Sequence, residues 1–253
     1  MNTNLASIVT GGGRGIGRSI ALRMAKETAV LVVGRTQSDL ESVCQEIDKQ
    51  GGTAELCTGD VSDPATAERA VQQAQVKGWT IRNLVLNAGI AKGGAATSFD
   101  KDVWREIFAV NVHGSFYFIQ ACLPALVEQK AGSICLMSSI AGLKGFKYES
   151  AYCASKHALV GLARSLALEY AKHGIVVVPI CPGFVESDMT RRTIQGLVKH
   201  RALSEAQATE LVANKNPQRR ILPADEVAEA VALVCCGKVP SLNGNPLVLS
   251  GGE

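Results

Sequence analysis

The stretch Thr10-Gly11-Gly12-Gly13-Arg14-Gly15-Ile16-Gly17 decides the fold, because of the two runs that flank it. The apolar run LASIVT (5–10) precedes it, and SIALRMAKE (19–27), an amphipathic run of helical length, follows it. Glycines between a strand and a helix permit a tight turn and let backbone N–H groups approach a pyrophosphate at the positive end of the helix dipole. An ordinary loop would also use glycines, but the flanking elements favour a dinucleotide-binding turn. We expect the cofactor to contact Gly11, Gly13, Arg14, Gly15, Ile16 and Gly17.

Apolar runs of strand length recur along the chain, with helix-length amphipathic stretches between most of them. The six further runs are AVLVVG (29–34), TAELCT (53–58), NLVLNAG (83–89), GSICLMSS (132–139), GIVVVPICP (174–182) and GNPLVLSGG (244–252). Their nearly continuous apolar character is typical of parallel strands buried on both faces. The pattern predicts a single α/β domain over residues 1–253, a Rossmann-type doubly wound parallel sheet with helices on both faces.

Composition narrows the possible partners. The 253 residues are 47% hydrophobic and 19% charged, enough for a large core and against disorder. A formal net charge of +3 is too small and scattered for nucleic acid to be the main partner. The chain start lacks the charge and apolar pattern of a leader, and no run approaches the roughly 20 apolar residues of a membrane helix. We expect a cytoplasmic protein with reduced core cysteines, no membrane partner and no metal site, since the four histidines lack ligand spacing.

Residues 186–222 interrupt the alternation of strands and helices. The segment is predicted to be mostly helical, with Ile194, Leu197 and Val198 at helical spacing, and is a candidate substrate-binding lid. It holds seven basic and four acidic residues. This excess fits either a solvated helix face or a site for an acidic substrate handle such as a phosphate.

The tip of the second apolar run indicates which dinucleotide binds. An acidic side chain there binds the ribose 2′-hydroxyl of NAD, whereas this chain has Arg35 and no carboxylate. The Arg35 guanidinium can hold a 2′-phosphate, and Arg14 can approach the same group. We therefore predict NADP(H), the alternative being that Arg35 is a solvated surface arginine.

Two further strand ends carry candidate cofactor contacts. Asp60, followed by Val61, stands where a carboxylate can meet the adenine amino group, although it can equally be a helix cap or turn residue. Asn87-Ala88-Gly89 closes the next run, at the edge where ligands collect in open α/β sheets. Its small residues would let the backbone lie against a ribose, and a simple turn fits as well.

Tyr152 and Lys156 are spaced i, i+4 at the beginning of a helical stretch, so their side chains leave the same face. A free phenol titrates near pH 10, and an adjacent ammonium is expected to lower that pKa and make the phenol a usable acid and base. Lys156 can also hydrogen-bond the nicotinamide ribose. Many helices contain such a pair by chance, so its meaning depends on what surrounds it.

Two other polar residues complete a candidate catalytic set. Ser138 and Ser139 end an apolar run, and we choose Ser139 to polarise a substrate carbonyl, the alternative being that both cap the strand end. Asn111 is polar among apolar neighbours, and a buried amide needs partners. It could bind a water that connects Lys156 to solvent, or pair with neighbouring backbone.

Together these motifs resemble the classical short-chain dehydrogenase/reductase family over essentially the full length. The shared elements are TGxxxGxG, Asn-Ala-Gly, an internal Asn, a Ser thirteen residues before YxxxK, and Pro182-Gly183 after the next strand. The resemblance implies a catalytic tetrad of Asn111, Ser139, Tyr152 and Lys156, with Tyr152 protonating the carbonyl oxygen as NADPH delivers hydride. It also implies that Val185 and Ser187 contact the nicotinamide carboxamide. A homotetramer or homodimer is implied too, with interfaces on the helices around Asn111 and Tyr152 and on the last strand.

Within the family, the chain is most similar to the 3-oxoacyl-ACP reductases. This implies reduction of a 3-oxoacyl thioester carried on acyl carrier protein or CoA. The chain departs from that group at Ser187, usually Thr, and at Lys130 and His173, where arginines commonly dock the carrier. Reduction of another ketone, such as a sugar, a steroid or a small carbonyl compound, therefore stays open. A cofactor-binding scaffold or sensor without chemistry is the alternative from another class.

Overall fold

The structure is a computed structural model that describes residues 4–253. Its strands form one parallel sheet of seven, in the order β3-β2-β1-β4-β5-β6-β7. The bounds are β1 Leu5–Thr10, β2 Ala29–Gly34, β3 Ala54–Thr58, β4 Thr80–Leu86, β5 Gly132–Met137, β6 Ile175–Pro182 and β7 Leu247–Leu249. The doubly wound parallel sheet predicted from the apolar runs is confirmed.

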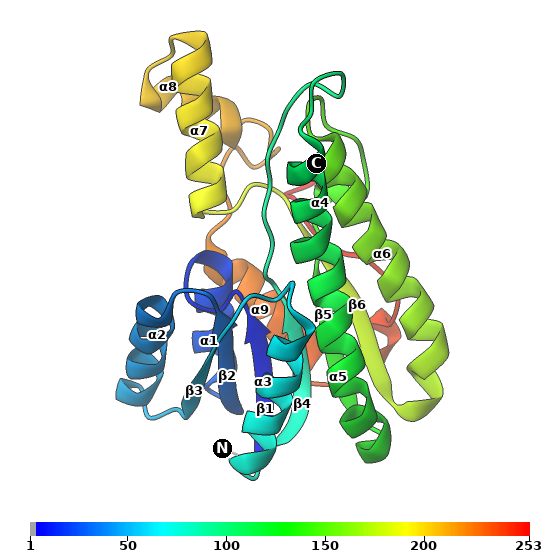
Figure 1. Ribbon diagram of the computed structural model, residues 1–253. Coiled ribbons are helices and arrows are strands. Elements are labelled where there is room, and N and C mark those ends of the chain that lie inside the picture. Colours follow the sequence, from blue (N-terminus) through cyan, green and yellow to red (C-terminus); the bar gives the residue numbers. More distant parts are fainter. Residues whose placement is uncertain (1–3) are drawn as a thin grey trace.

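Helices cover both faces of this sheet (Figure 1). One core contains side chains of α3, α5 and α6, and the opposite core contains those of α1, α2 and α9. The helices flanking the sheet are α1 Gly15–Met24, α2 Gln37–Lys49, α3 Pro64–Val76, α4 Lys101–Phe108, α5 Gly114–Gln129, α6 Ser150–Tyr170 and α9 Ala224–Cys235. Burial on both faces explains why the strands read as continuous apolar runs.

The strand order places the ligand-binding edge. The chain runs outward from β1 to β3 and then returns to the other side of β1 with β4, so the order reverses between β1 and β4. In open parallel sheets, ligands bind at such a reversal, outside the carboxyl ends of the strands. Thr10, Leu86 and Met137 are the last residues of three strands that end at this edge.

The segment 186–222 stands over the same edge (Figure 1). It holds α7 Asp188–Arg201 and α8 Glu205–Ala213, as its helical periodicity predicts. Ser187 and Ser204 cap the two helices through their side chains. The segment has a small core of its own, separate from the two cores of the sheet, in which Leu197, Val198 and other partly buried residues pack on Ile194, Ala208 and Val212.

A π-turn, Ala109–His113, joins α4 and α5 into one helical stretch, Lys101–Gln129. By length and composition this stretch could cross a membrane, with a mean hydropathy of 1.2 over its most apolar window. No apolar run in the sequence indicated such a stretch. Phe118, Ile119, Cys122 and Leu126 on α5 are fully buried in the core beside the sheet. That burial accounts for part of the apolar composition, since 39% of this window is buried inside the protein.

Candidate active site

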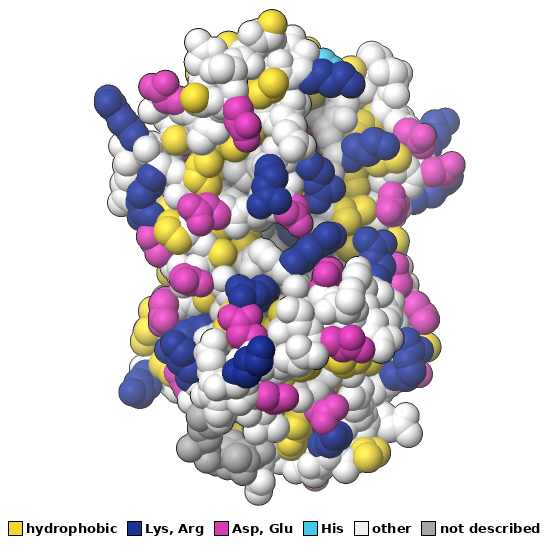
Figure 2. All heavy atoms as spheres, turned by 90° about the vertical axis from the view of Figure 1, so that its left-hand side faces the viewer, with side chains coloured by type: hydrophobic (Ala, Val, Ile, Leu, Met, Phe, Trp, Pro, Cys, Tyr) yellow, Lys and Arg dark blue, Asp and Glu magenta, His cyan; other side chains and the backbone are white. Residues whose placement is uncertain are grey.

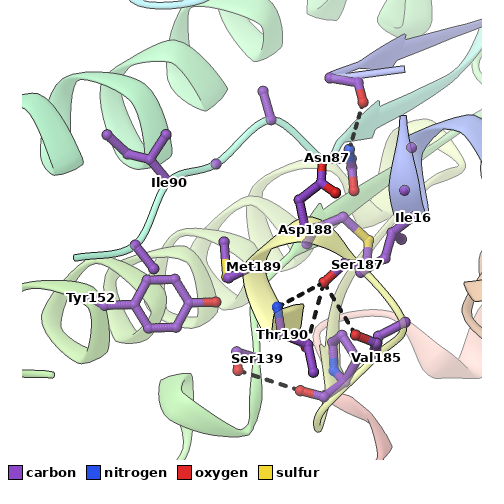
Figure 3. A pocket seen from close by; sticks show the side chains of 18 of the residues that line it. Ile16, Asn87, Ile90, Ser139, Tyr152, Val185, Ser187, Asp188, Met189 and Thr190 are labelled. Atoms are coloured by element: carbon purple, nitrogen blue, oxygen red, sulfur yellow. Dashed lines mark hydrogen bonds between the residues drawn. The ribbon is translucent and has the colours of Figure 1, made fainter. Parts of the chain in front are cut away.

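A cavity of about 740 Å³ opens at the carboxyl edge of the sheet, between the strand ends and α7. All residues predicted to bind the cofactor line it, and so do Ser139, Tyr152 and Lys156 of the predicted catalytic set. Figure 3 shows Asn87, Ser139, Tyr152 and Ser187 grouped around this space. Asn111 is the exception, because it is fully buried behind the cavity wall.

The glycine turn packs too tightly to accept a side chain at its centre. A Cβ built on Gly17 would lie 2.1 Å from the carbonyl oxygen of Gly11, whose own φ is +62°. Asn87 holds the turn from the next strand, since its Nδ2 donates to the carbonyl oxygens of Thr10 and Gly11, both at 3.1 Å. α1 then begins with neither a side-chain cap nor an acidic residue in its first turn. Its first N–H groups are therefore available to an anionic ligand, as a cofactor pyrophosphate requires.

A side chain at Gly17 should disrupt the glycine turn and the anion-binding N–H groups at the start of α1. We expect Gly17→Ala to weaken NADPH binding by at least about 100-fold, because the new methyl group overlaps a backbone oxygen that cannot move without unfolding the turn. Titration of NADPH by fluorescence measures the effect. Gly161→Ala on α6 is the matched control: nothing lies within 4 Å of its Cβ, so it should bind normally and gain about 0.5–1 kcal/mol of stability. Equal NADPH affinity in Gly17→Ala and the wild type would contradict this account of the turn.

Arg35 and Asp60 lie together at the tips of β2 and β3, on the cavity wall. The Arg35 Nη1 is 3.7 Å from Asp60 Oδ2, and both side chains are largely exposed, so the pair itself adds little stability. Asp60 Oδ1 accepts hydrogen bonds from the amide and hydroxyl of Ser62 at 2.9 and 2.7 Å. Burial raises the pKa of Asp60, but the two Ser62 bonds and Arg35 outweigh it, and the net pKa lies below its ordinary value. Asp60 is thus a turn residue that stays ionised, while Asp63 caps α3.

Arg14 lines the cavity together with Arg35. Its Nη1 lies 3.7 Å from Asp188 Oδ2, at the start of α7. Asp188 also accepts a bond from Arg191 at 2.9 Å. The glycine turn and the 186–222 segment are therefore linked across the mouth of the cavity.

Tyr152 and Lys156 leave the first turns of α6 toward the cavity, as their spacing predicts. Figure 3 shows the Tyr152 phenol reaching into the cavity near Ser139. The Lys156 Nζ lies 5.5 Å from the centre of the Tyr152 ring and donates a 2.7 Å hydrogen bond to the carbonyl oxygen of Met137. The strand end of β5 therefore holds the ammonium beneath the phenol.

The expected lowering of the Tyr152 pKa is wrong for this structure. Burial raises the pKa of Tyr152 to about 12, and the neighbouring Ser139 hydroxyl opposes this only in part. Lys156 is not among the groups that lower the pKa of Tyr152. Burial lowers the pKa of Lys156 itself to about 8. At neutral pH the phenol is therefore protonated, the form that can donate a proton.

The two serines at the end of β5 have different hydrogen-bond partners. The Ser138 hydroxyl donates a 2.8 Å bond to the carbonyl oxygen of Lys156 and is committed to holding α6. The Ser139 hydroxyl donates a longer 3.3 Å bond to the carbonyl oxygen of Pro182, drawn in Figure 3, and accepts one from the amide of Ala141. Ser139 thus caps a 3₁₀ turn, the alternative weighed above, and also faces the cavity.

Asn111 occupies the middle of the π-turn, which the sequence analysis did not foresee. Its Oδ1 accepts from the amide of Ile90 at 2.8 Å, and its Nδ2 donates to the carbonyl oxygen of Ile90 and the hydroxyl of Ser155, both at 3.0 Å. Pairing with neighbouring backbone is thus the arrangement found. A Cβ built on Gly89 would lie 3.3 Å from Asn111 Oδ1 and 3.4 Å from Lys156 Nζ, so the amide still stands close to the lysine. π-turns often occur at functional sites, where the extra residue redirects a side chain.

The remaining predicted contacts follow two loops. Val61, Ala88 and Gly89 line the cavity from the ends of β3 and β4, and Pro182, Gly183, Val185 and Ser187 line it between β6 and α7. The Ser187 hydroxyl donates to the carbonyl oxygen of Val185 at 3.1 Å and caps α7 by accepting from the amide of Thr190. In residues 4–253, no three His, Cys, Asp or Glu side chains gather into a metal-binding group.

Sequence reasoning missed three supporting residues. The Thr10 hydroxyl accepts from the amides of Asn87 and Ala88 at 3.0 and 3.1 Å and so fixes the Asn-Ala-Gly turn. Ser155 receives the Asn111 bond and donates to the carbonyl oxygen of Tyr152 at 2.8 Å. Glu149 lines the cavity one helical turn before Tyr152. The available signals were a hydroxyl at a strand end, a serine between the catalytic pair, and an acid at the start of a helix.

Comparison with known proteins identifies the class. The family model for short chain dehydrogenases matches residues 6–197. The chain is 32% identical to oxidoreductase UcpA of Escherichia coli K12 over 99% of this chain and 95% of that protein. It is 32% identical to the 3-oxoacyl-[acyl-carrier-protein] reductase FabG of the same strain, over 97% of this chain and 96% of that protein.

A solved structure shows the same fold. A mutant actinorhodin polyketide ketoreductase with NADPH superposes with a TM-score of 0.95, at 30% identity, over 98% of this chain and 97% of that one. The fold and site thus define a nicotinamide-dependent oxidoreductase. The chain belongs to the short-chain dehydrogenase family, which confirms the resemblance drawn from its motifs.

Proposed function

We propose that this protein reduces a ketone to a secondary alcohol with NADPH. One observation carries the proposal: a tyrosine phenol, a lysine ammonium and a serine hydroxyl converge on the cavity that the glycine turn opens into. A scaffold or sensor without chemistry would have no need of this arrangement. The similarity to a ketoreductase solved with NADPH and to 3-oxoacyl reductases supports both the reaction and its direction.

The residues present fit NADP(H). The side-chain-free floor at Gly17 admits a pyrophosphate, and the exposed Arg35 guanidinium at the tip of β2 offers charge-assisted bonds to a 2′-phosphate. The Asp60 carboxylate lies 3.7 Å from the Arg35 guanidinium. Because its negative charge is partly balanced by Arg35, Asp60 orients the guanidinium without strongly repelling a 2′-phosphate. Val185 and Ser187 would hold the nicotinamide end, and Lys156 the ribose.

Bound in the cavity, NADPH would supply the hydride that the carbonyl carbon accepts. Tyr152, protonated at neutral pH, donates its proton to the carbonyl oxygen as that oxygen gains charge. The Ser139 hydroxyl turns from the carbonyl oxygen of Pro182 to polarise the substrate oxygen. Lys156, held by Met137, stabilises the phenolate until solvent restores the proton. Asn111 keeps the π-turn and Ser155 in place beneath this set.

Two substrate classes are candidates. The 3-oxoacyl reductases among the relatives support a 3-oxoacyl thioester on acyl carrier protein or CoA. Lys130 and His173, the positions expected to dock a carrier, precede β5 and β6 and so lie at the amino edge of the sheet, opposite the cavity of the same chain. This observation favours a free ketone.

Initial rates with NADPH and NADH test the proposal, using acetoacetyl-CoA beside a panel of simple and hydroxylated ketones. We expect at least one ketone to be reduced and NADPH to be preferred by at least about 10-fold in kcat/KM, because a bound 2′-phosphate gains charge-assisted bonds. Arg35→Ala should remove most of that preference. Turnover of no ketone would overturn the function, and an NADH preference in the wild type would overturn the cofactor.

We further propose a cytoplasmic homo-oligomer, with 186–222 as its substrate-binding lid. All eight cysteines carry free thiols, and six of them are buried, as suits a reducing compartment. Phe116 on α5, Leu168 on α6 and Val248 on β7 expose large apolar side chains, and Leu168 is 85% exposed. These positions lie on the helices and the last strand where the family resemblance places subunit contacts.

A further inference from the structure

Glu149 is the group in the cavity for which ketone reduction has no evident use. It directly precedes α6 and lines the cavity one helical turn before Tyr152. Its Oε2 is buried and has no hydrogen-bond partner among residues 4–253. A Cβ built on Gly93 would lie 2.8 Å from its Oε1, so the loop over the site closes against the carboxylate.

The usual structural roles of such a residue are absent here. Glu149 is the N-cap residue of α6, yet its side chain makes no capping hydrogen bond. Within residues 4–253, no Lys, Arg or His nitrogen lies within 4.0 Å of its carboxylate. Burial raises the pKa of Glu149, and the charge of Lys215 opposes this without forming a contact. A buried carboxylate oxygen without a hydrogen-bond partner costs free energy, so Oε2 is placed to accept a hydrogen bond from a bound ligand.

The chemistry of the cavity limits what that partner is. An ionised carboxylate only accepts hydrogen bonds, so the ligand group must be a donor, either a hydroxyl or an ammonium. Arg192, Arg201 and Lys215 line the same cavity. Figure 2 shows Lys and Arg side chains around the hollow between the 186–222 segment and the rest of the protein. This basic rim disfavours a cationic ligand and leaves the hydroxyl.

The location ties the donor to the reacting carbon. Glu149 and Tyr152 line the same cavity one helical turn apart, so a substrate whose carbonyl oxygen lies at the Tyr152 hydroxyl presents its neighbouring atoms to the Glu149 carboxylate. We propose that Glu149 is a specificity-determining residue whose carboxylate accepts a hydrogen bond from a hydroxyl group that the substrate carries beside its carbonyl. The proposal rests on the ketone-reductase function above and selects a hydroxylated ketone from its candidate substrates.

A matched pair of ketones tests this assignment. Wild-type enzyme with NADPH should favour 3-hydroxy-2-butanone over 2-butanone in kcat/KM by about 10- to 100-fold, the range expected for a hydrogen bond to a charged group. Without enzyme, the two ketones react with a hydride donor at rates whose ratio gives their intrinsic reactivity. In Glu149→Leu, the kcat/KM ratio should fall to within a few-fold of that intrinsic ratio. Glu149→Gln, which keeps an acceptor oxygen but no charge, should give an intermediate ratio.

The ratio of two substrates does not depend on how much variant enzyme is folded. Glu169→Gln is the control on the same helix, because Glu169 is exposed and bonded only to Ser165, and its ratio should equal that of the wild type. An unchanged ratio in Glu149→Leu would overturn the role of Glu149, and so would turnover of acetoacetyl-CoA but of no hydroxyketone. Loss of turnover on every ketone in the wild type would instead overturn the proposed function itself.

Discussion

Tyr152→Phe is expected to lower kcat for ketone reduction by about 10³-fold while NADPH binds with nearly unchanged affinity. The substitution keeps the ring, whose centre lies 5.5 Å from Lys156 Nζ, and deletes only the hydroxyl that we propose donates the proton. Without that donor, the carbonyl oxygen must gain negative charge before water can protonate it. The remaining rate would come from Ser139 and from the positioning of the reactants.

Single-turnover rates with saturating NADPH and ketone measure the effect on the chemical step. Tyr170→Phe at the end of α6 is the control, because it removes a hydroxyl from the same helix outside the cavity. Its kcat should equal that of the wild type. Normal turnover in Tyr152→Phe would mean that another group donates the proton.

Lys156→Met should move activity and stability in opposite directions. The lysine is only 5% exposed, and burial lowers its pKa from 10.5 to about 8, so the folded protein disfavours its charge. Removing that charge relieves roughly 3 kcal/mol, from which the lost bond to Met137 subtracts about 1 kcal/mol. We expect the variant to be more stable than the wild type by about 2 kcal/mol at pH 7 and to lose at least about 10²-fold in kcat/KM.

The pH dependence separates charge from packing. Between pH 8 and 10.5 the folded wild type has released the Lys156 proton while the unfolded chain still holds it, so wild-type stability rises with pH through this window. The advantage of Lys156→Met is therefore complete below about pH 8 and fades toward pH 10.5. Urea unfolding at pH 7 and 10, at one protein concentration, measures the difference. A gap that does not change with pH would show that packing is its source, and exposed Lys172→Met should show no gap at either pH.

The fold was largely predictable because its signals are repeated and local. Seven apolar runs mark the seven strands, and the motif residues follow strand ends, which parallel pairing brings to one edge. The limits of the strands were less certain. β4 begins at Thr80, three residues before the run 83–89. The run missed these residues because Thr80, Ile81 and Arg82 alternate in burial and so lack the continuous apolar pattern. β7 keeps only Leu247–Leu249 of the run 244–252, since it pairs along one side only.

The motif residues were predicted to share one site, and the structure places most of them around one cavity, but their contacts were not predictable. Arg14 belongs to the glycine turn, yet only the fold shows that its guanidinium lies 3.7 Å from the carboxylate of Asp188, far along the chain. A π-turn differs from an α-helix by one residue, which no periodicity near Asn111 reveals. Glu149 resembles any acid at a helix start, and its unpaired oxygen depends on the loop at Gly93. The i, i+4 spacing of Tyr152 and Lys156 indicates that they share a helix face but not that they are buried. The effect of burial on their pKa values was therefore not predictable from the sequence.

The segment of α7 and α8 has its own small core around Ile194, Ala208 and Val212. Mutations that reshape its cavity-facing side chains therefore need not disturb the packing of the sheet, where the reacting groups are fixed. Evolution can revise one part while selection holds the other constant. For protein engineering, 186–222 is therefore a segment suited to exchange between relatives. A transplanted segment that keeps the Ile194–Ala208–Val212 packing should change substrate preference while the residues around the sheet edge stay the same.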